Sequence, residues 1–543
     1  MNADNHNAHE IYLKEHRNQI INKCIQELLD EYYERGFIDK KEILKIKNKY
    51  SSRLTNIKNS DLLIFAENNL QRETFQLLKS ILAIKKTRTI SGIAAIAIMT
   101  ISDCPHGRCI YCPKGDNAPQ SYTGEEPATL RARQYNFDPY LQVQARLKHY
   151  KMLGYEPEKC ELIIMGGTFL SMSQNYIEWF MKNAYDGFNN CRANSLDEAI
   201  KLNETAKHRV IGTTFETKPD WCKEKHVDLM LKLGGTRVEI GVQCLDDNIY
   251  KIVNRGHTIQ DVKEATKIAR NAGFKICYHM MPGLFADKEK DLSYFKELFE
   301  NENYRPDMLK IYPTLVLPDT GLYQLWKSGK FIPYTNEEIV DLLVEIKKII
   351  PKYVRIMRIQ RDIPAKLIAA GPTISNAREI ALKRLKSQKI RCRCIRCREL
   401  GIRQMYNENP SLDFELKIDK YLANGSIEYF ISFESSDETL AGFLRLRDIK
   451  ESHRNELNDS VVVRELHVYG MQIPISSEER VLTNLSASAQ HLGYGKKLLQ
   501  KAEEIAQDLN KKRIAIISGI GVREYYRKLG YKLVGPYMVK EID

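Results

Sequence analysis

The sequence lacks any hydrophobic run long enough to cross a membrane. Its longest apolar stretch, Gly92 to Ile101, covers about ten residues, whereas a membrane helix needs roughly twenty. The opening residues are polar and lack the apolar segment of a secretory leader. We therefore expect a cytoplasmic protein without membrane contact, and we interpret the apolar stretch as a buried strand.

Acidic residues are too few to balance the basic ones. The chain has 70 Asp and Glu residues against 83 Lys and Arg residues, a formal net charge of +13. This excess favours a polyanionic partner such as nucleic acid, although an ordinary basic enzyme has the same composition. The length of 543 residues suggests three or four domains of about 150 residues each.

Hydrophobic periodicity divides the chain into four predicted parts. Residues 1–84 form a basic region with helical spacing alone, and residues 85–384 alternate apolar runs with amphipathic helices. Residues 385–410 form a basic, cysteine-rich linker, and residues 411–543 mix strands and helices. The apolar runs of the second part are Gly92–Thr100, Glu161–Thr168, Arg209–Thr217, Thr236–Gln243, Phe274–Gly283 and Met308–Val316.

Six strand-helix units in succession predict an α/β fold whose parallel sheet is buried on both faces. An open doubly wound sheet and a partial (β/α) barrel both fit this pattern. In either arrangement the chemistry is expected at the carboxyl ends of the strands. The C-terminal part has predicted strands at Gly442–Arg447, Ser460–Tyr469 and Arg513–Ser518.

Three cysteines, Cys104, Cys109 and Cys112, follow the first predicted strand in the segment CPHGRCIYCPKG. A structural zinc site usually has four protein ligands, a set that His106 would complete here. An iron–sulfur cluster held by three thiolates instead leaves one iron open to a substrate. The loop resembles that of the radical-SAM superfamily, including the aromatic residue before the last cysteine, here Tyr111. Its first gap is one residue longer than in the commonest form.

The resemblance to radical-SAM enzymes implies a [4Fe–4S] cluster, S-adenosylmethionine and an external electron donor. Gly166, Gly167 and Thr168, after the second strand, resemble the glycine motif that contacts the methionine part of the cofactor. A simple tight turn is the alternative interpretation, because Gly-Gly pairs are common in turns. Glu216, at the end of the third strand, is a candidate contact for the ribose or amino group.

The segment from Gln490 to Gly495 resembles the CoA-binding loop of GNAT acetyltransferases, which includes Gly493. Two glycines let backbone N–H groups come close to a ligand, and the following helix adds its dipole, so this loop suits the pyrophosphate of acetyl-CoA. In that family a tyrosine on a later helix often lies near the CoA sulfur. Tyr525 and Tyr526 occupy this place, and we favour Tyr526, with core packing as the alternative.

A second cysteine group, Cys392, Cys394 and Cys397, lies in the predicted linker. It suits a structural zinc ion if a fourth ligand comes from elsewhere, and three free buried thiols are the alternative. Arginines alternate with these cysteines, and a further basic run precedes the linker. These residues favour contacts with RNA phosphates, although a solvated charged face is the alternative. They are Arg355, Arg358, Arg361, Lys383, Arg384, Lys386, Lys389, Arg391, Arg393, Arg396 and Arg398.

From about residue 85 onward the chain resembles the catalytic subunit of the Elongator complex and its single-subunit archaeal and bacterial relatives. The stretches that carry the resemblance are QSYTGEEP (Gln120–Pro127), MGGTF (Met165–Phe169), NRGHT (Asn254–Thr258), HMMPGL (His279–Leu284), YPTLV (Tyr312–Val316), TGLYQLW (Thr320–Trp326), QRDIP (Gln360–Pro364), RELHVYG (Arg464–Gly470) and GPYMVK (Gly535–Lys540).

This resemblance implies an enzyme that carboxymethylates carbon 5 of the wobble uridine in the tRNA anticodon stem-loop. A deoxyadenosyl radical would take hydrogen from the acetyl group of acetyl-CoA, the carbon radical would add to the uracil, and thioester hydrolysis would leave the carboxymethyl group. Lys159 matches a family lysine linked to acetyl-CoA, with a solvated lysine as the alternative. The cleft for acetyl-CoA would be lined by Glu465, Leu466, His467, Val468, Tyr494, Gly495 and Lys496.

Three tyrosines, Tyr111, Tyr312 and Tyr323, are candidates to stack on a splayed base, and Tyr312 is also a catalytic candidate. The main rival function is a protein lysine acetyltransferase that uses the GNAT domain alone. A methylthiotransferase-like radical enzyme would need a second iron–sulfur cluster, and a pure tRNA-binding scaffold would turn over no cofactor. A homo-oligomer is compatible with the sequence.

Overall fold

The computed structural model separates into two compact units, which are residues 1–88 with 145–157 and residues 89–144 with 158–543. Among the described residues, every helix is too short or too polar to span a bilayer. The structure describes residues 2–51, 57–82, 91–153, 155–406, 408–469 and 493–542, without the side chains of residues 2–14 and Ser80.

The smaller unit is helical, as the periodicity of the first residues predicts. Its helices bury their apolar faces in one core that contains Leu28, Leu62 and Leu78. The side chain of Asp39 begins the second helix, because its carboxylate accepts hydrogen bonds from two backbone N–H groups of the first turn. The helices are α1 (Asn2–Arg35), α2 (Lys40–Tyr50), α3 (Asn59–Asn69) and α4 (Arg72–Leu82).

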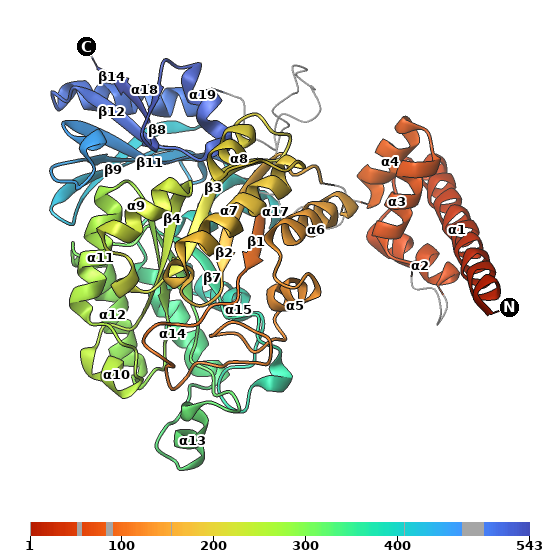
Figure 1. Ribbon diagram of the computed structural model, residues 1–543, viewed down its shortest axis with the longest axis horizontal. Coiled ribbons are helices and arrows are strands. Elements are labelled where there is room, and N and C mark those ends of the chain that lie inside the picture. Colours follow the sequence, from red (N-terminus) through yellow and green to blue (C-terminus); the bar gives the residue numbers. More distant parts are fainter. Residues whose placement is uncertain are drawn as a thin grey trace. The chain divides into compact units, whose positions relative to one another are not determined.

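A parallel sheet of seven strands, arranged in chain order, forms the first half of the larger unit (Figure 1). It is a partial barrel, which confirms the predicted α/β fold class and decides between the two predicted arrangements. The structure adds one strand, β7, to the six predicted from apolar runs. The strands are β1 (Ala94–Met99), β2 (Lys159–Met165), β3 (Arg209–Thr217), β4 (Gly235–Gln243), β5 (Lys275–Met280), β6 (Met308–Ile311) and β7 (Arg355–Ile359).

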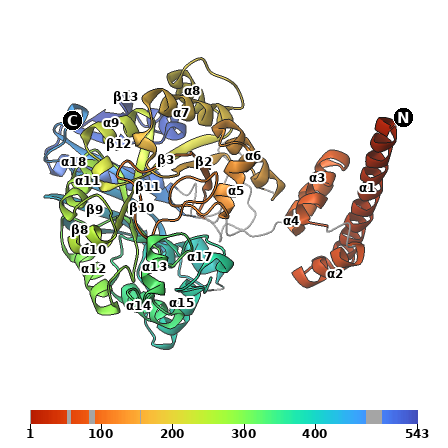
Figure 2. The ribbon, with the colours of Figure 1, turned by 60° about the horizontal axis from the view of Figure 1, so that its bottom comes forward.

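Helices cover the outer side of this curved sheet, as the two views of the ribbon show (Figure 2). Strand residues that face the helices are apolar, and the alternate residues face the interior of the barrel. In chain order, the helices between β1 and β8 are α5 (Pro127–Gln134), α6 (Pro139–Met152, of which residues 145–152 belong to the smaller unit), α7 (Gln174–Asn189), α8 (Leu196–Asn203), α9 (Glu224–Lys232), α10 (Asp247–Ile252), α11 (Ile259–Asn271), α12 (Lys288–Glu300), α13 (Gly321–Lys327), α14 (Asn336–Ile349), α15 (Ala377–Ser387), α16 (Ile395–Arg398) and α17 (Leu400–Met405).

A second seven-stranded sheet follows, in the order β13-β14-β12-β11-β10-β9-β8. Only β11 and β12 are parallel neighbours, and the other pairs are antiparallel. Helix α18 packs across its central strands around a core that includes Leu498 and Ala502. The elements are β8 (Glu415–Ala423), β9 (Ser426–Glu434), β10 (Leu440–Asp448), β11 (Ser460–Val468), α18 (Tyr494–Asp508), β12 (Arg513–Ile517), α19 (Arg523–Arg527), β13 (Lys532–Val534) and β14 (Tyr537–Glu541).

Buried ion pairs join this second sheet to the amino-terminal ends of the barrel strands. Arg464 of β11 donates two hydrogen bonds of 2.7 Å to Asp307, the residue before β6, and both side chains are fully buried. Arg464 also pairs with Glu428 of β9 at 2.9 Å. The two sheets therefore form one body, with the C-terminal sheet at one end of the barrel strands and the strand-end loops at the other.

Candidate functional site

The loop between β1 and α5 carries the first three cysteines at the carboxyl end of the barrel sheet. The side chain of Gln120 fixes its shape, because Oε1 accepts from the Cys104 N–H at 2.8 Å and Nε2 donates to the Gly107 carbonyl at 2.8 Å. The buried guanidinium of Arg255 lies 3.7 Å from the Cys109 sulfur. Hydrogen bonds from Gln120 therefore hold the loop in a defined conformation, with a positive charge beside the Cys109 sulfur.

The spacing of these sulfurs fits a cluster better than a single ion. Burial raises the pKa of Cys112 to about 11, so a thiolate there needs a cation beside it. Sulfurs bound to one tetrahedral zinc ion lie about 3.8 Å apart, for bonds of about 2.3 Å. No three of Cys104, His106, Cys109 and Cys112 bring their ligand atoms within 4.8 Å of one another. These donors therefore do not form the compact set that a zinc knuckle needs, and three thiolates on one loop are the protein ligands that a [4Fe–4S] cluster with one open iron uses.

The glycine motif after β2 packs directly against this loop. Gly166 and Gly167 have φ angles of +109° and +48°, and a Cβ on either would lie 2.4 Å from a backbone oxygen, of Thr100 or Ser102. The hydroxyl of Thr168 donates to the Cys104 sulfur at 3.5 Å. The structure thus brings the predicted glycine motif and the cysteine loop together, with backbone close to the place where the cofactor is expected.

Charged side chains line the barrel interior below this loop. Glu216, at the end of β3, lies 3.4 Å from the Tyr122 hydroxyl and 3.4 Å from the Lys310 ammonium. The same ammonium contacts Glu239 of β4, which accepts a hydrogen bond from His279 of β5. Four neighbouring strands, β3 to β6, therefore contribute to one network that includes the predicted cofactor residue Glu216.

The structure places Lys159 and Tyr312 at opposite ends of the barrel strands. Lys159 begins β2, at the end that faces the C-terminal sheet, and burial lowers the pKa of its ammonium group. Tyr312 follows β6 near the carboxyl ends, half-buried against the ring of His279 with centroids 5.4 Å apart. A strand as long as β2 spans roughly 20 Å. The two candidate residues therefore lie at different ends of the barrel interior.

Strand β11 opens away from β12 where the acetyl-CoA cleft is predicted. The two strands pair only from Ser460 to Val463, so residues 465–468 extend beyond the paired segment. Glu465 faces the barrel and accepts from Arg445 at 2.9 Å, and the ring of His467 hydrogen-bonds the Ser91 carbonyl oxygen at 3.0 Å. Leu466 and Val468 point to the other side, toward the core under α18.

The described part of the predicted CoA loop is the start of α18. Gly493 precedes the helix with φ +82°, and Tyr494 packs its ring against Phe433 with centroids 4.6 Å apart. Gly495 lies in the first turn, and Lys496 is exposed. Backbone N–H groups of this first turn are available for a phosphate. The predicted residue Gln490 lies outside the described residues.

The tyrosine pair on α19 separates into one buried and one exposed residue. Tyr526 is 6% exposed and packs into the core of the C-terminal sheet, and burial raises its pKa. Tyr525 is 37% exposed, and its hydroxyl would lie 3.3 Å from a Cβ placed on Gly495. Tyr525 therefore reaches toward the CoA-type loop, while the favoured Tyr526 remains a prediction.

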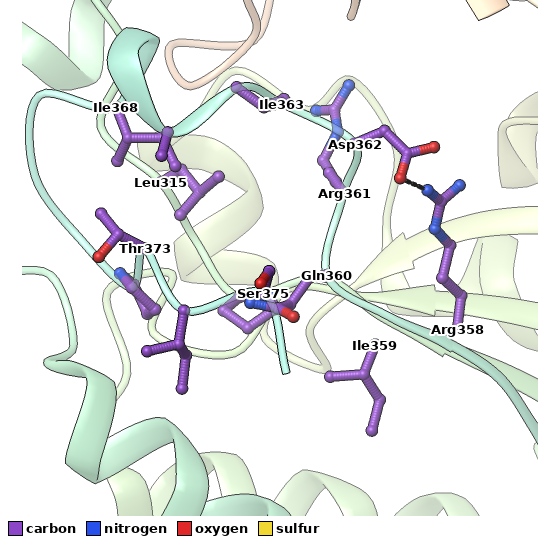
Figure 3. Close-up of a pocket in the computed structure, with 14 residues that line it drawn as sticks. Leu315, Arg358, Ile359, Gln360, Arg361, Asp362, Ile363, Ile368, Thr373 and Ser375 are labelled. Carbon is purple, nitrogen blue, oxygen red and sulfur yellow. Dashed lines mark ion pairs between the residues drawn. The ribbon is translucent and has the colours of Figure 1, made fainter. Parts of the chain in front are cut away.

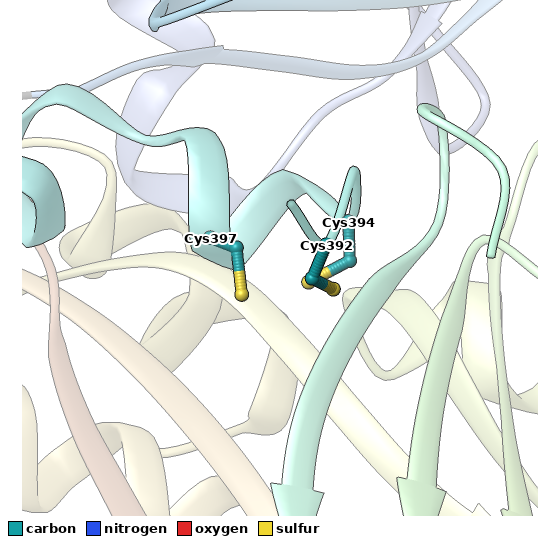
Figure 4. Close-up of side chains that lie close together, drawn as sticks. All are labelled: Cys392, Cys394 and Cys397. Carbon is teal, nitrogen blue, oxygen red and sulfur yellow. The ribbon is translucent and has the colours of Figure 1, made fainter. Parts of the chain in front are cut away.

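The second cysteine group is compact (Figure 4). The sulfurs of Cys392, Cys394 and Cys397 lie within 4.8 Å of one another, the spacing of ligands around one ion. The fully buried Lys347 of α14 places its ammonium 3.6 Å from the Cys392 sulfur and 3.9 Å from the Cys397 sulfur. Within the described residues, this lysine lies where a fourth ligand was sought, and no carboxylate or imidazole completes the group.

Several arginines expected to contact RNA are instead part of the fold. The half-buried Arg355 pairs with Glu399 at 2.5 Å, and the buried Arg398 pairs with Glu434 at 2.9 Å. Their positive charges are neutralised inside the protein, so the prediction of phosphate contacts is wrong for these two. The residues of this set that remain exposed are Lys383, Lys386, Lys389, Arg391 and Arg393.

A cavity of about 270 Å³ opens between the loops that follow β6 and β7 (Figure 3). Gln360, Thr373 and Ser375 contribute polar groups, while Arg358 pairs with Asp362 at its rim. Arg361, in the same loop, donates to the carbonyl of Ser121 beside the cysteine loop. The cavity therefore lies at the same end of the barrel as the three cysteines. Spacing along the sequence did not predict it.

Family comparisons agree with the geometry of both halves. The radical SAM superfamily matches residues 98–299, its C-terminal domain matches residues 306–387, and the acetyltransferase (GNAT) family matches residues 395–531. The chain is thus a radical SAM enzyme with an acetyltransferase domain. This class implies a [4Fe–4S] cluster, S-adenosylmethionine and acetyl-CoA, as predicted, and the cysteine spacing described above fits the cluster.

Curated relatives define the particular family. The tRNA uridine(34) acetyltransferase of Methanocaldococcus jannaschii is 44% identical over 550 residues, covering 98% of this chain and all of the relative. Elongator complex protein 3 of Homo sapiens is 43% identical over 472 residues, covering 84% and 85%. The solved structure of Methanocaldococcus infernus Elp3 with an N-terminal deletion has a TM-score of 0.74 at 43% identity, covering 83% and 100%. The chain belongs to this family, which confirms the predicted resemblance.

Proposed function

We propose that this protein attaches an acetyl-CoA-derived carboxymethyl group to carbon 5 of the wobble uridine of tRNA. One observation carries the proposal: a single body holds the three-cysteine loop at one end of the barrel strands and the CoA-type loop domain at the other. Relatives named tRNA uridine(34) acetyltransferase support the choice of nucleotide. The alternative, a protein lysine acetyltransferase, is not favoured because it leaves the cysteine loop without a role.

The proposed roles at the barrel mouth follow from the contacts there. Bound cluster and S-adenosylmethionine would supply a radical that takes hydrogen from carbon. Cys104, Cys109 and Cys112 hold the cluster, and the backbone of Gly166–Thr168 lies close enough to contact the methionine part of S-adenosylmethionine. Glu216, tied to Lys310, orients the ribose or amino group.

The proposed roles at the other end concern acetyl-CoA. The segment from Gly493 to Lys496 binds the pyrophosphate through backbone N–H groups. The end of β11 that pairs with β10 but not with β12, Glu465–Val468, lines the pantetheine path. Lys159, which is desolvated at the amino end of β2, contacts the thioester end of acetyl-CoA, and Tyr526 lies beside the CoA sulfur. The polar interior of the barrel, with Tyr312 near its mouth, then leads from this domain toward the cysteine loop.

We propose that the tRNA anticodon stem-loop contacts the exposed cations of the linker region. Lys383, Lys386, Lys389 and Arg391 line a cavity of about 570 Å³ on this surface, where their charges would meet phosphates. A zinc ion on Cys392, Cys394 and Cys397 would hold the linker in shape. An external electron donor, a cytoplasmic location and a homo-oligomer complete the proposal.

The test is an anaerobic reaction with tRNA, S-adenosylmethionine, a reductant and acetyl-CoA, followed by nucleoside analysis. Cys109→Ser is expected to abolish carboxymethyluridine and 5′-deoxyadenosine together. Cys191→Ser, a change at an exposed cysteine of the same chain, is the matched control and is expected to leave both products unchanged. If the wild-type protein formed no modified uridine while acetylating protein lysines, the proposal would be overturned.

A further inference from the structure

The interior face of β5 carries an imidazole near the carboxyl end of the strand. The neighbouring side chain Tyr278 hydrogen-bonds Thr266 of α11, so it faces the helix layer. Side chains alternate along a strand, so His279 faces the interior. Its ring lies against Tyr312 with centroids 5.4 Å apart, near the carboxyl end of the strands. The position is between the cysteine loop and the C-terminal domain.

The ring of His279 is held by one carboxylate. Its Nε2 lies 2.8 Å from Oε2 of Glu239, and the carboxylate accepts, so Nε2 carries the hydrogen and Nδ1 keeps a free lone pair. Glu239 is fully buried, while the side chain of His279 is 15% exposed. Among the described residues, no other hydrogen bond engages the ring. The arrangement is that of a base oriented by an acid.

Neighbouring cations keep Glu239 ionised. Burial alone would raise the pKa of this carboxyl, but the Lys310 ammonium, the hydrogen bond from His279 and the Arg237 guanidinium hold it well below its usual range. Glu239, His279 and Cys277 also have the spacing of metal ligands. The ammonium of Lys310 already contacts the carboxylate, which disfavours a second cation there. The group therefore suits proton transfer better than metal binding.

We propose that His279 is the general base that hydrolyses the thioester left after the acetyl carbon has joined the uracil, with Glu239 as its positioning residue. This inference rests on the proposed function. A water molecule adds to the thioester carbonyl as Nδ1 takes its proton. The carbon–sulfur bond then breaks, and the imidazolium returns the proton to the leaving CoA sulfur. One water yields one carboxylic acid and one thiol, and no electron is exchanged.

The location supports this step more than proton transfer elsewhere. The reacting methyl carbon has to lie near the cysteine loop, and the CoA loop lies at the opposite end, so the thioester carbonyl falls within the interior between them. His279 is the imidazole that the barrel strands present there. The charged and titratable groups that face it are Glu216, Arg237, Glu239, Cys277, Lys310 and Tyr312.

The decisive experiment measures thiol release from acetyl-CoA by the full chain with tRNA but without S-adenosylmethionine. No radical forms under these conditions, and hydrolysis needs none. His279→Gln is expected to lower the rate at least about a hundredfold, the effect of losing a general base, and to remove the rise of the rate with pH that an imidazole causes. Acetyl-CoA affinity, measured by calorimetry, and the melting temperature are expected to stay the same.

The control is His453→Gln, because His453 forms an equivalent 2.8 Å pair with Asp228 outside the barrel interior. It is expected to retain the wild-type rate and pH profile. In the complete reaction, His279→Gln is expected to form 5′-deoxyadenosine normally while CoA remains attached to tRNA as a thioester.

Two results would separate the possible failures. If the His279→Gln variant released thiol at the wild-type rate and with the wild-type pH profile, the assignment of the base would be overturned, even if carboxymethyluridine formed. If His279→Gln lost thiol release while His453→Gln kept it, the assignment of the base would be supported. If the wild-type protein then modified no uridine, the proposed function would be overturned.

Discussion

Replacement of Asp307 by Asn tests whether buried charge joins the barrel to the C-terminal sheet. The carboxylate accepts two 2.7 Å bonds from Arg464 and one 2.8 Å bond from the Ile276 N–H, and Arg445 lies 3.5 Å away. Asn preserves the shape but removes the charge, which leaves buried guanidinium groups without their partner. Breaking such a pair costs about 3–5 kcal/mol. We expect the free energy of unfolding to fall by this amount.

Urea unfolding at pH 7, followed by fluorescence of Trp179, Trp221 and Trp326 in the barrel, measures the loss. Asp228→Asn is the control, because this carboxylate also contacts two basic side chains but is 42% exposed. Exposed pairs contribute about 0–1 kcal/mol, so the control is expected to shift little. Equal shifts in the two variants would refute the argument that the buried network holds the domains together.

The pH dependence has a definite sign. Burial would raise the pKa of Asp307, but Arg464 and Arg445 lower it far below the usual value. The contribution of this ionised carboxylate to the free energy of unfolding is therefore complete above the unfolded-state pKa of about 3.9, and it declines as the pH falls below that value. At pH 3.5 protonation of the unfolded chain removes about 0.7 kcal/mol of the wild-type stability. The difference between the wild type and Asp307→Asn is expected to narrow by that amount.

Three further predictions concern the two cofactor regions. Gly167→Ala is expected to lower the bound iron and the affinity for S-adenosylmethionine at least tenfold, because the added Cβ would collide with backbone. Gly329→Ala is the control: this glycine also has a positive φ but has open space around it, so neither quantity is expected to change. Cys394→Ser is expected to remove zinc and leave iron unchanged, as elemental analysis would show; zinc retention would contradict a site there. Loss of carboxymethyluridine formation is expected in Tyr526→Phe and not in Tyr525→Phe, and the opposite order of rates would exchange their roles.

Apolar strands and the first cysteine loop could be predicted from the sequence because their signals are local. Runs such as Arg209–Thr217 and Thr236–Gln243 are buried on both sides, and they fall within one or two residues of β3 and β4. The three cysteines lie within nine residues of one another, so one loop is enough to bring them together. The glycine motif was predictable for the same reason.

Other elements were missed because tertiary contacts define them. Strand β7 has arginines at two of its five positions, and Arg355 is accommodated only because Glu399 of the linker pairs with it. Strand β8 alternates apolar with charged residues, but Leu416 and Ile418 lie on its exposed face, so the period alone did not give its orientation.

The pairing of His279 with Glu239 depends on the neighbouring positions of β4 and β5 in the sheet, 40 residues apart in the sequence. Spacing along the chain contains no such information. A polar residue within an otherwise apolar strand was the available sign, because such a residue on an interior-facing position needs a partner.

The most direct test of the whole account follows the acetyl carbon. Protein prepared without oxygen would be incubated with tRNA, S-adenosylmethionine, a reductant and acetyl-CoA labelled at the methyl carbon, and nucleoside 34 would be analysed by mass spectrometry. We expect a carboxymethyl group on carbon 5 that contains the labelled carbon, formed together with 5′-deoxyadenosine. Unlabelled uridine in the presence of bound iron and bound acetyl-CoA would contradict it.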